Sequence, residues 1–378
     1  MKENDKRIQI FDIAKGISIV LMTIGRYDFT AIYPYLMEFQ NIVMVLKMPT
    51  FIFISGYLLS NRLSFKHFLH HKIDGLIKPL ISFILSLTVL KIIFYVLVSD
   101  VVTFKDAFGY IINLGRYVYN GSFDAINVSF WFIMALFLGQ ITLKGFLEIK
   151  EFNKPKNYIF LTVFFLVLIV LNTIQIKLHW TQYIPIFFTY LLLGYSFKEI
   201  STRYLNGTSF FYSNKMLVFP ILFFVSQFML HRFNVKIDFN LAGLHYNYHY
   251  LLILSLLGVF TVLYLCRYIE KIPFLNSFFV YCSRASFFIL AYHIFIKDVY
   301  VVLFDLKSYN PLLHTFLFFS NIIICCLIYR FLKKVPFVRI GFYPIKTIAL
   351  NDAEIEFLKS KYINRFIPEE IFLDHATR

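Results

Sequence analysis

Hydrophobic residues lie in long runs along this chain, separated by short polar stretches. A helix needs about 20 apolar residues to cross the roughly 30 Å hydrocarbon core of a bilayer, and ten runs have about that length. This pattern predicts an all-α integral membrane protein with about ten transmembrane helices. The predicted spans are approximately residues 11–32, 41–60, 76–98, 129–147, 158–176, 182–197, 216–231, 250–268, 282–304 and 312–332.

The distribution of Lys and Arg between the runs predicts the topology. The amino-terminal tail and the connections 61–75 and 198–215 carry three basic residues each, whereas the connection 33–40 carries none. Cytoplasmic loops of membrane proteins are enriched in Lys and Arg. The alternation therefore places both termini in the cytoplasm, as an even number of spans requires.

The composition agrees with lipid as the main solvent. Of the 378 residues, 59% are hydrophobic and 16% are charged, whereas soluble domains carry about 25% charged residues. The net charge of +15, from 37 basic and 22 acidic residues, would suggest nucleic acid on a soluble protein. Basic cytoplasmic loops explain it here, and we expect no nucleic-acid partner.

The chain divides into a membrane domain, residues 1–332, and a polar cytoplasmic tail, residues 333–378. In the tail, Asn351 to Ile363 is either a short amphipathic helix at the membrane surface or a solvated segment. The first run is too long and too charged for a signal peptide. The four cysteines lack zinc-site spacing, and we expect them to be buried apolar residues, with no metal site.

Two cations in the first run stand out. Lys15 and Arg26 are 11 residues apart, which at 100° per residue leaves them about 20° from the same side of a helix and about 16.5 Å apart along its axis. Such a stripe suits an anionic group that enters from the cytoplasm. Asp12, three residues before Lys15, offers a structural ion pair instead.

Ionisable residues within spans usually face a protein interior or a water-filled cavity. Long side chains near span ends can instead extend to the interface. We interpret Lys78, Lys91, Lys144 and Lys297 in this second way.

Five segments, in order, resemble one family. They are Asp12–Arg26 (DIAKGISIVLMTIGR), Lys47–Tyr57 (KMPTFIFISGY), Lys72 to Pro79, Ser129–Leu136 (SFWFIMAL) and Ser283 to His293. This order and the expected topology resemble the membrane-bound acyltransferase family 3, especially its fucose 4-O-acetylase-like sugar O-acetyltransferases.

The resemblance implies O-acetylation: transfer of an acyl group, usually acetyl, from cytoplasmic acetyl-CoA or another acyl-CoA to a sugar hydroxyl. The acceptor would be a glycan or lipid-linked sugar of a cell-surface or exported polysaccharide, and the location a bacterial inner membrane. No bound cofactor is implied beyond the donor substrate. The implied roles are a catalytic cavity with Lys15, Arg26 and His293, donor binding by Lys47, Lys72 and Lys78, and an acceptor side with Trp131 and Arg284.

The sequence departs from the family pattern at two histidine positions. Arg26 stands where the family has its catalytic histidine, and Lys47 replaces a second one. Arginine stays protonated and cannot accept a proton from a hydroxyl, whereas a desolvated lysine can lose its own. His293 offers a base of ordinary pKa near 6.5.

Three interpretations follow from these departures. The first is an active acyltransferase with another base or with oxyanion stabilisation by Arg26. The second is a catalytically impaired member of the family, and the third is a membrane transporter or channel.

Overall fold

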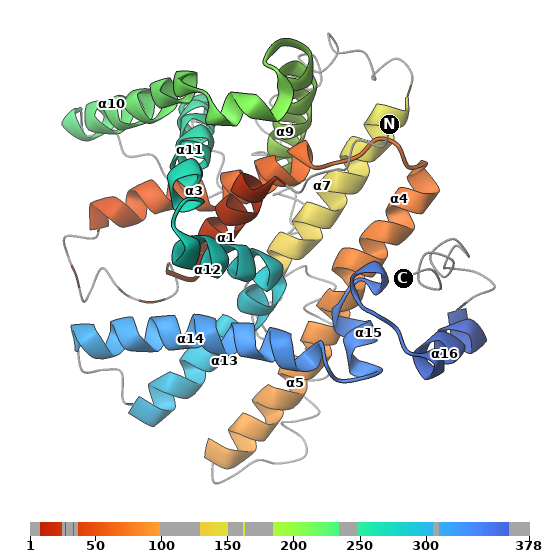
Figure 1. The fold of residues 1–378 in the computed structure, drawn as a ribbon. Helices are drawn as coiled ribbons and strands as arrows, with labels where there is room; N and C mark the ends of the chain where they lie inside the picture. Colours follow the sequence, from red (N-terminus) through yellow and green to blue (C-terminus); the bar gives the residue numbers. More distant parts are fainter. Residues whose placement is uncertain are drawn as a thin grey trace, which may run out of the picture. The chain divides into compact units, whose positions relative to one another are not determined.

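The structure is a computed structural model that describes residues 8–24, 27, 33, 37–98, 129–149, 162, 184–233, 248–304 and 310–362. These residues form helices, and none of them lies in a β-strand (Figure 1). They group into two compact units, which we describe separately. The first unit takes in residues 1–59 and 138–326, and the second takes in residues 60–137 and 327–378.

The helices that lie wholly within the first unit come from both of its stretches of the chain. They are α1 (Gln9–Ile24), α3 (Met37–Tyr57), α9 (Ile184–Tyr204), the 3₁₀ segments η4 (Gly207–Tyr212) and η5 (Asn214–Leu217), α10 (Val218–Arg232), α11 (Tyr248–Ile269), α12 (Pro273–Arg284) and α13 (Ser286–Phe304).

Two further helices have residues in both units. They are α7 (Phe130–Glu148) and α14 (Pro311–Leu332). The second unit contains the remaining helices. They are α4 (Phe65–Lys72), the π-helix η2 (Ile73–Ile77), α5 (Lys78–Val98), α15 (Val338–Phe342), the 3₁₀ turn η6 (Ile345–Thr347) and α16 (Asp352–Tyr362).

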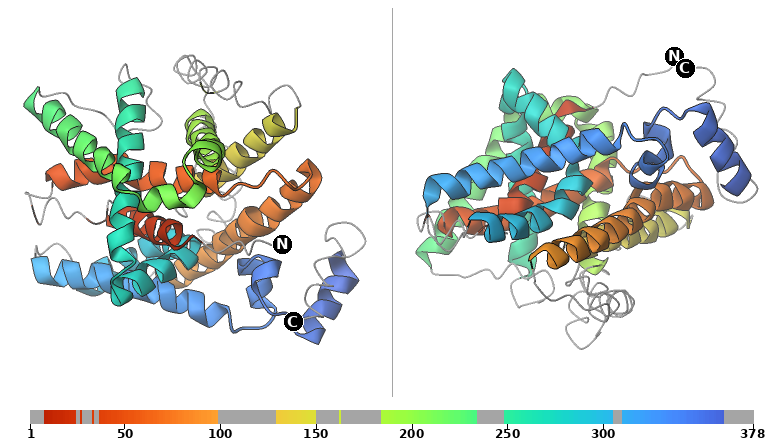
Figure 2. Two further views of the ribbon diagram at one scale, coloured as in Figure 1. Left: turned by 45° about the horizontal axis from the view of Figure 1, so that its top comes forward. Right: turned by 90° about the horizontal axis from the view of Figure 1, so that it is seen from below.

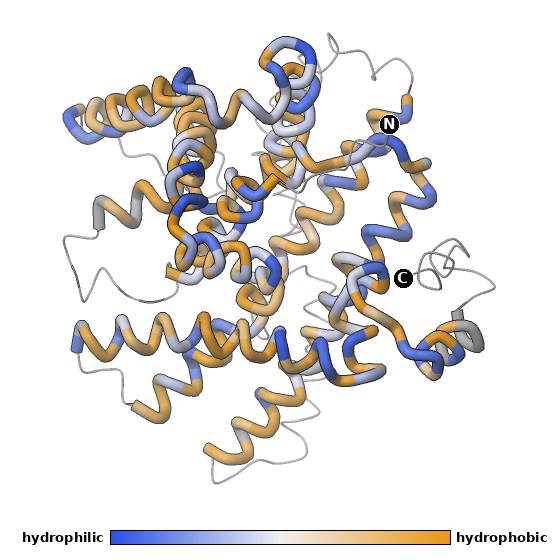
Figure 3. The backbone as a smooth tube through the Cα atoms, viewed as in Figure 1, coloured by the Kyte–Doolittle hydropathy of each residue, from blue (hydrophilic) through white to orange (hydrophobic). Residues whose placement is uncertain are grey.

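Several helices have the length and hydropathy of membrane spans. Within the described ranges six helical stretches meet both criteria, and the hydropathy drawn in Figure 3 is high along α5, α10 and α14. α5 has 21 residues, which at 1.5 Å per residue is about 31 Å and matches the hydrocarbon thickness. The protein is therefore a multi-pass membrane protein. The six stretches are 65–98, 130–148, 214–232, 250–269, 286–304 and 311–332.

The predicted runs correspond closely to these helices. Nine of the ten overlap a described helix, and the fifth, 158–176, lies outside the described residues except for residue 162. The predicted ninth span, 282–304, is wrong at its start because α12 ends at Arg284 and α13 begins at Ser286. The total of ten spans and the cytoplasmic termini stay predictions.

The core of the first unit is aromatic. Phe11 of α1 packs edge-on against Tyr57 of α3 and Phe211 of η4, with ring centroids 4.7 and 5.1 Å apart. Phe260 of α11 similarly meets Phe53 of α3 at 5.6 Å. α1 therefore lies at the centre of the unit, where it packs on α3, α11, α12 and α13 (Figure 2).

Glycines allow the central helices to approach closely. A Cβ atom at Gly16 of α1 would overlap the backbone carbonyl of Phe279 in α12. Each of the helices α3 and α9 likewise has a glycine against the backbone of the other. Gly56 lies on the backbone of Leu191, and Gly194 lies on that of Phe53. Small residues at such crossings are typical of membrane helix pairs, whose association depends on close packing.

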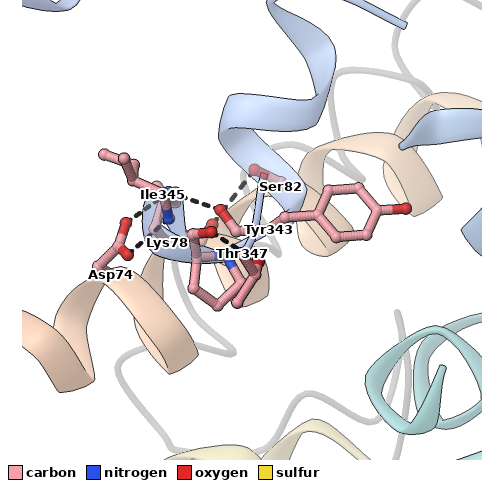
Figure 4. A network of polar contacts seen from close by, with 7 residues as sticks. Asp74, Lys78, Ser82, Tyr343, Ile345 and Thr347 are labelled. Atoms are coloured by element: carbon pink, nitrogen blue, oxygen red, sulfur yellow. Dashed lines mark hydrogen bonds and ion pairs between the residues drawn. The ribbon is translucent and has the colours of Figure 1, made fainter. Parts of the chain in front are cut away.

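In the second unit the carboxyl-terminal segment packs on the junction of η2 and α5 (Figure 4). The Asp74 carboxylate contacts the Lys78 ammonium at 2.5 Å and accepts the backbone N–H of Ile345 at 2.9 Å. Lys78 also donates to the carbonyl of Tyr343 at 2.9 Å. The segment after α14 is thus folded onto α5 within this unit. The division into a membrane domain, 1–332, and a polar cytoplasmic tail, 333–378, stays a prediction.

A buried carboxylate stabilises the start of α16. Glu354 is fully buried and binds the Arg339 guanidinium and the backbone N–H of Phe337. It also forms a capping box with Asn351, in which each residue's backbone N–H donates to the other's side chain. The Arg339 guanidinium, followed by these backbone donors, lowers the pKa of Glu354 to about 2. A helix is therefore confirmed within the predicted segment 351–363.

Candidate functional site

Two lysines of the first unit lie on the helices α1 and α3, which pack on each other. The Lys15 ammonium of α1 is 5.3 Å from the centroid of the Phe51 ring in α3. Lys47 is four residues before Phe51, on the same face of α3, and it is only 8% exposed. The structure therefore brings two of the predicted site cations to the packed α1 and α3 helices.

A network of hydrogen bonds joins α13, α14 and Tyr27, which follows α1. The amide nitrogen of Asn321 in α14 donates to the Tyr27 hydroxyl at 2.5 Å and to the backbone carbonyl of His293 at 2.8 Å. Its amide oxygen accepts from the Cys325 thiol at 3.5 Å. Asn321 is 1% exposed, so one buried side chain fixes the helix that carries His293 against two other segments.

The orientation of the His293 imidazole is set by its own helix. Its Nδ1 atom lies 2.7 Å from the carbonyl oxygen of Ile289 and 3.1 Å from that of Leu290. Because both neighbours are acceptors, Nδ1 carries the hydrogen, and the neutral ring has its lone pair on Nε2. This tautomer is the one that a general base acting through Nε2 requires.

A third cation lies one turn beyond His293. The Lys297 ammonium is 5.8 Å from the centroid of the Tyr27 ring, and the same ring packs edge-on against Phe318 at 5.4 Å. The sequence interpretation of Lys297 as an interfacial side chain missed this contact. Tyr27 and Asn321 were also missed, although an asparagine within an apolar run such as 312–332 is a usable signal.

The remaining predicted site residues are Arg26, Arg284, Trp131 and Lys72. Arg26 lies outside the described residues, next to Tyr27. Arg284 is exposed at the end of α12, and Trp131 is half-buried in the second-unit part of α7, where its ring contacts Phe132. Lys72 ends α4 with its ammonium 5.1 Å from the Phe68 ring.

Lys78 is engaged by Asp74 and Tyr343, as described above. Lys72 and Lys78 thus belong to the second unit, and Lys15, Lys47 and His293 belong to the first.

Lys144 corrects a second sequence interpretation. We expected this lysine to extend to the interface, but it is 1% exposed and its ammonium lies 3.0 Å from the Glu148 carboxylate. Four-residue spacing on α7 brings the two side chains together.

Cys266, Cys282 and Cys325 are buried, as predicted for apolar cysteines, whereas Cys326 is only half-buried, so the prediction is wrong for that residue. Across the described ranges, no three His, Cys, Asp or Glu side chains are grouped as a metal site.

Comparison with known protein families shows the family to which this chain belongs. The model of the membrane acyltransferase family 3, described as an acyltransferase domain, matches residues 8–330. No curated protein and no solved structure matches significantly. The chain belongs to acyltransferase family 3, and its general activity is acyl transfer at a membrane.

Proposed function

We propose that this protein transfers an acyl group, most simply acetyl, from cytoplasmic acyl-CoA to a hydroxyl of a membrane-presented or exported sugar. The observation that carries the proposal is the buried His293 imidazole, whose Nδ1 is held by the carbonyls of Ile289 and Leu290 so that Nε2 has the lone pair, in a chain of this family. Lys15 and Lys47 lie on α1 and α3, and α1 packs on both α3 and α13, so these helices supply cations for an anionic or polarised donor and an imidazole for the acceptor's proton. The fucose 4-O-acetylase-like branch and a bacterial inner membrane are part of the proposal.

In the proposed reaction His293 is the general base. Its Nε2 lone pair accepts the proton of the sugar hydroxyl while the hydroxyl oxygen attacks the thioester carbonyl carbon. The carbon–sulfur bond then breaks, the acyl group remains on the sugar oxygen, and the CoA thiolate takes the proton back from the imidazolium. The atoms balance as ester plus CoA thiol.

The cations have complementary roles. The Lys15 and Lys47 ammonium groups stabilise negative charge that develops on the thioester oxygen, an effect that fixed charges in a buried site supply without reorganisation. Arg26, which cannot act as a base, adds a further permanent positive charge. Lys72 attracts the donor's phosphates from the cytoplasmic connection, whereas the contacts of Lys78 with Asp74 and Tyr343 favour a structural role for it.

Acyl-CoA turnover in proteoliposomes tests this function. The wild-type chain, supplied with carbonyl-labelled acetyl-CoA and a candidate oligosaccharide, is expected to release CoA thiol and to place an equal amount of label in an alkali-labile ester. His293→Gln, in which the amide cannot take up a proton at neutral pH, is expected to lose at least about 100-fold in kcat, the usual scale of general-base catalysis.

Two other outcomes would favour the alternatives. Sugar flux across the vesicle membrane without any need for acyl-CoA would indicate a transporter. Acyl-CoA binding without turnover in the wild type, together with turnover in Arg26→His, would indicate a chain impaired by the missing imidazole.

A further inference from the structure

Four side chains at the end of α11 form a compact cationic surface, which we name the tyrosine–arginine cluster: Tyr264, Arg267, Tyr268 and Lys271. Tyr264 and Tyr268 are four residues apart, as are Arg267 and Lys271, so the four side chains share one side of the helix end. The apolar stretch 250–269 has the length and hydropathy of a membrane span. The cluster therefore lies where such a span meets the headgroup region.

Two aromatic rings hold the guanidinium of Arg267. Its central carbon lies 5.1 Å from the centroid of Tyr264 and 5.1 Å from that of Tyr268. The two rings meet edge-on at 5.3 Å, and their hydroxyls are hydrogen-bonded at 2.8 Å. The Lys271 ammonium lies 5.7 Å from the Tyr268 ring, so one tyrosine faces two positive charges.

The guanidinium is also tied to the neighbouring η4–η5 segment. It donates to the carbonyl of Ser213 at 3.2 Å and to the side chain of Asn214 at 3.4 Å. These bonds use two of its five N–H groups, which leaves donors for an external anion. Arg267 is thereby preorganised, because its side chain loses little further freedom when a ligand binds.

The acid nearest in sequence is directed to another partner. The Glu270 carboxylate accepts from the Tyr212 hydroxyl at 3.1 Å. Within the described part of the chain, neither Arg267 nor Lys271 forms an ion pair with a carboxylate. Lys271 is exposed, and Tyr268 is 44% exposed, so the cluster has the accessibility and the net positive charge that an anionic ligand needs.

We propose that the tyrosine–arginine cluster binds the phosphate of an anionic phospholipid headgroup. The guanidinium and ammonium pair with the phosphate oxygens, and the hydroxyl hydrogen not used between the two tyrosines is available to a third oxygen. A lipid phosphate is favoured over free inorganic phosphate because the cluster lies at the end of a membrane span, where lipid headgroups are at very high local concentration. Tyrosine and arginine at this depth are chemically suited to that boundary.

Native mass spectrometry of the full chain, released from micelles with equal phosphatidylglycerol and phosphatidylcholine, tests the proposal. The wild type is expected to retain phosphatidylglycerol preferentially. Arg267→Gln with Lys271→Gln is expected to weaken its retention by about fivefold per lost charge. The matched control, Lys333→Gln with Lys334→Gln, removes two exposed lysines just beyond another apolar helix and is expected to retain the lipid as the wild type does.

Arg267→Lys separates charge from geometry, since it keeps the cation but loses the planar group between the rings, and we expect it to bind between the wild type and the double variant. Because the double variant also loses the bonds of the guanidinium to Ser213 and Asn214, lipid retention is compared for the folded fraction of each variant, as measured in pure phosphatidylcholine. Three results would each overturn the proposal. The double variant and the lysine control could lose lipid equally, the wild type could show no preference for phosphatidylglycerol, or millimolar inorganic phosphate could displace the lipid.

Discussion

Asn321→Leu is the most informative single change in the candidate site. It removes the two hydrogen bonds that connect α14 with Tyr27 and with the His293 carbonyl, and also the weaker contact with Cys325. Interhelical hydrogen bonds in membrane proteins contribute about 0.6 kcal/mol each on average, which gives about 1 kcal/mol for the pair. A buried polar group left unsatisfied costs about 1–3 kcal/mol, so with the lost pair we expect a total loss of about 2–4 kcal/mol.

The expected effect on turnover is larger than the effect on folding. If the α13 backbone at His293 shifts by about 1 Å, the misplacement costs on the order of 100-fold in rate. We therefore expect kcat to fall by about 10- to 100-fold while KM for acyl-CoA stays within about twofold. Unfolding in micelles followed by circular dichroism, together with acyl transfer by the folded fraction, measures both quantities.

Gln227→Leu is the matched control for this prediction. Its buried amide nitrogen makes no hydrogen bond to any described residue, so the same Leu replacement is expected to be neutral or slightly stabilising and to leave kcat unchanged. If Asn321→Leu loses stability as predicted but keeps the wild-type kcat, Asn321 stabilises the fold without positioning His293, and the reasoning is refuted.

Two further predictions concern packing and pH. Gly16→Val, which places side-chain atoms on the Phe279 carbonyl, is expected to destabilise the fold by at least about 1–3 kcal/mol, whereas Gly75→Ala, where a Cβ meets nothing within 4 Å, should change it by less than about 1 kcal/mol; equal unfolding midpoints would contradict this. Because the pKa of Glu354 is lowered from 4.5 to about 2 in the folded state, its contribution is complete above about pH 4.5 and is lost as the pH falls toward 2. The hydrogen-exchange protection factors of residues 338–358, which are corrected for the intrinsic pH dependence of exchange, should therefore fall between pH 5 and pH 3 in the wild type and much less in Glu354→Gln; an identical fall in both would contradict the assignment.

The helices were predictable because lipid requires an apolar run of fixed length. The span predicted at 312–332 is α14 at 311–332, and the span predicted at 76–98 contains α5 at 78–98. The break between α12 and α13 did leave a signal, because Ser283, Arg284 and Ser286 interrupt the apolar run around Ala285, but so short an interruption was taken as part of the span.

The site was only partly predictable for a different reason. Lys15 and His293 were found because ionisable residues are rare within spans. Asn321 was missed because its partners are remote, with Tyr27 294 positions away and His293 28 positions away. Lys144 was misread because the sequence shows that a lysine is near a span end but does not show which neighbours bury it.

The proposed activity of this protein is acyl transfer to a sugar, with His293 as the base. The most direct measurement is the O-acetyl content of the envelope glycan, by NMR, in a host that lacks its own O-acetyltransferase and expresses the wild-type chain, His293→Gln or an empty vector, with equal membrane protein levels confirmed. We predict O-acetyl signals with the wild type alone. Equal acetylation with His293→Gln would contradict the role of His293, and its absence with the wild type, while purified protein also fails to release CoA, would contradict acyl transfer itself.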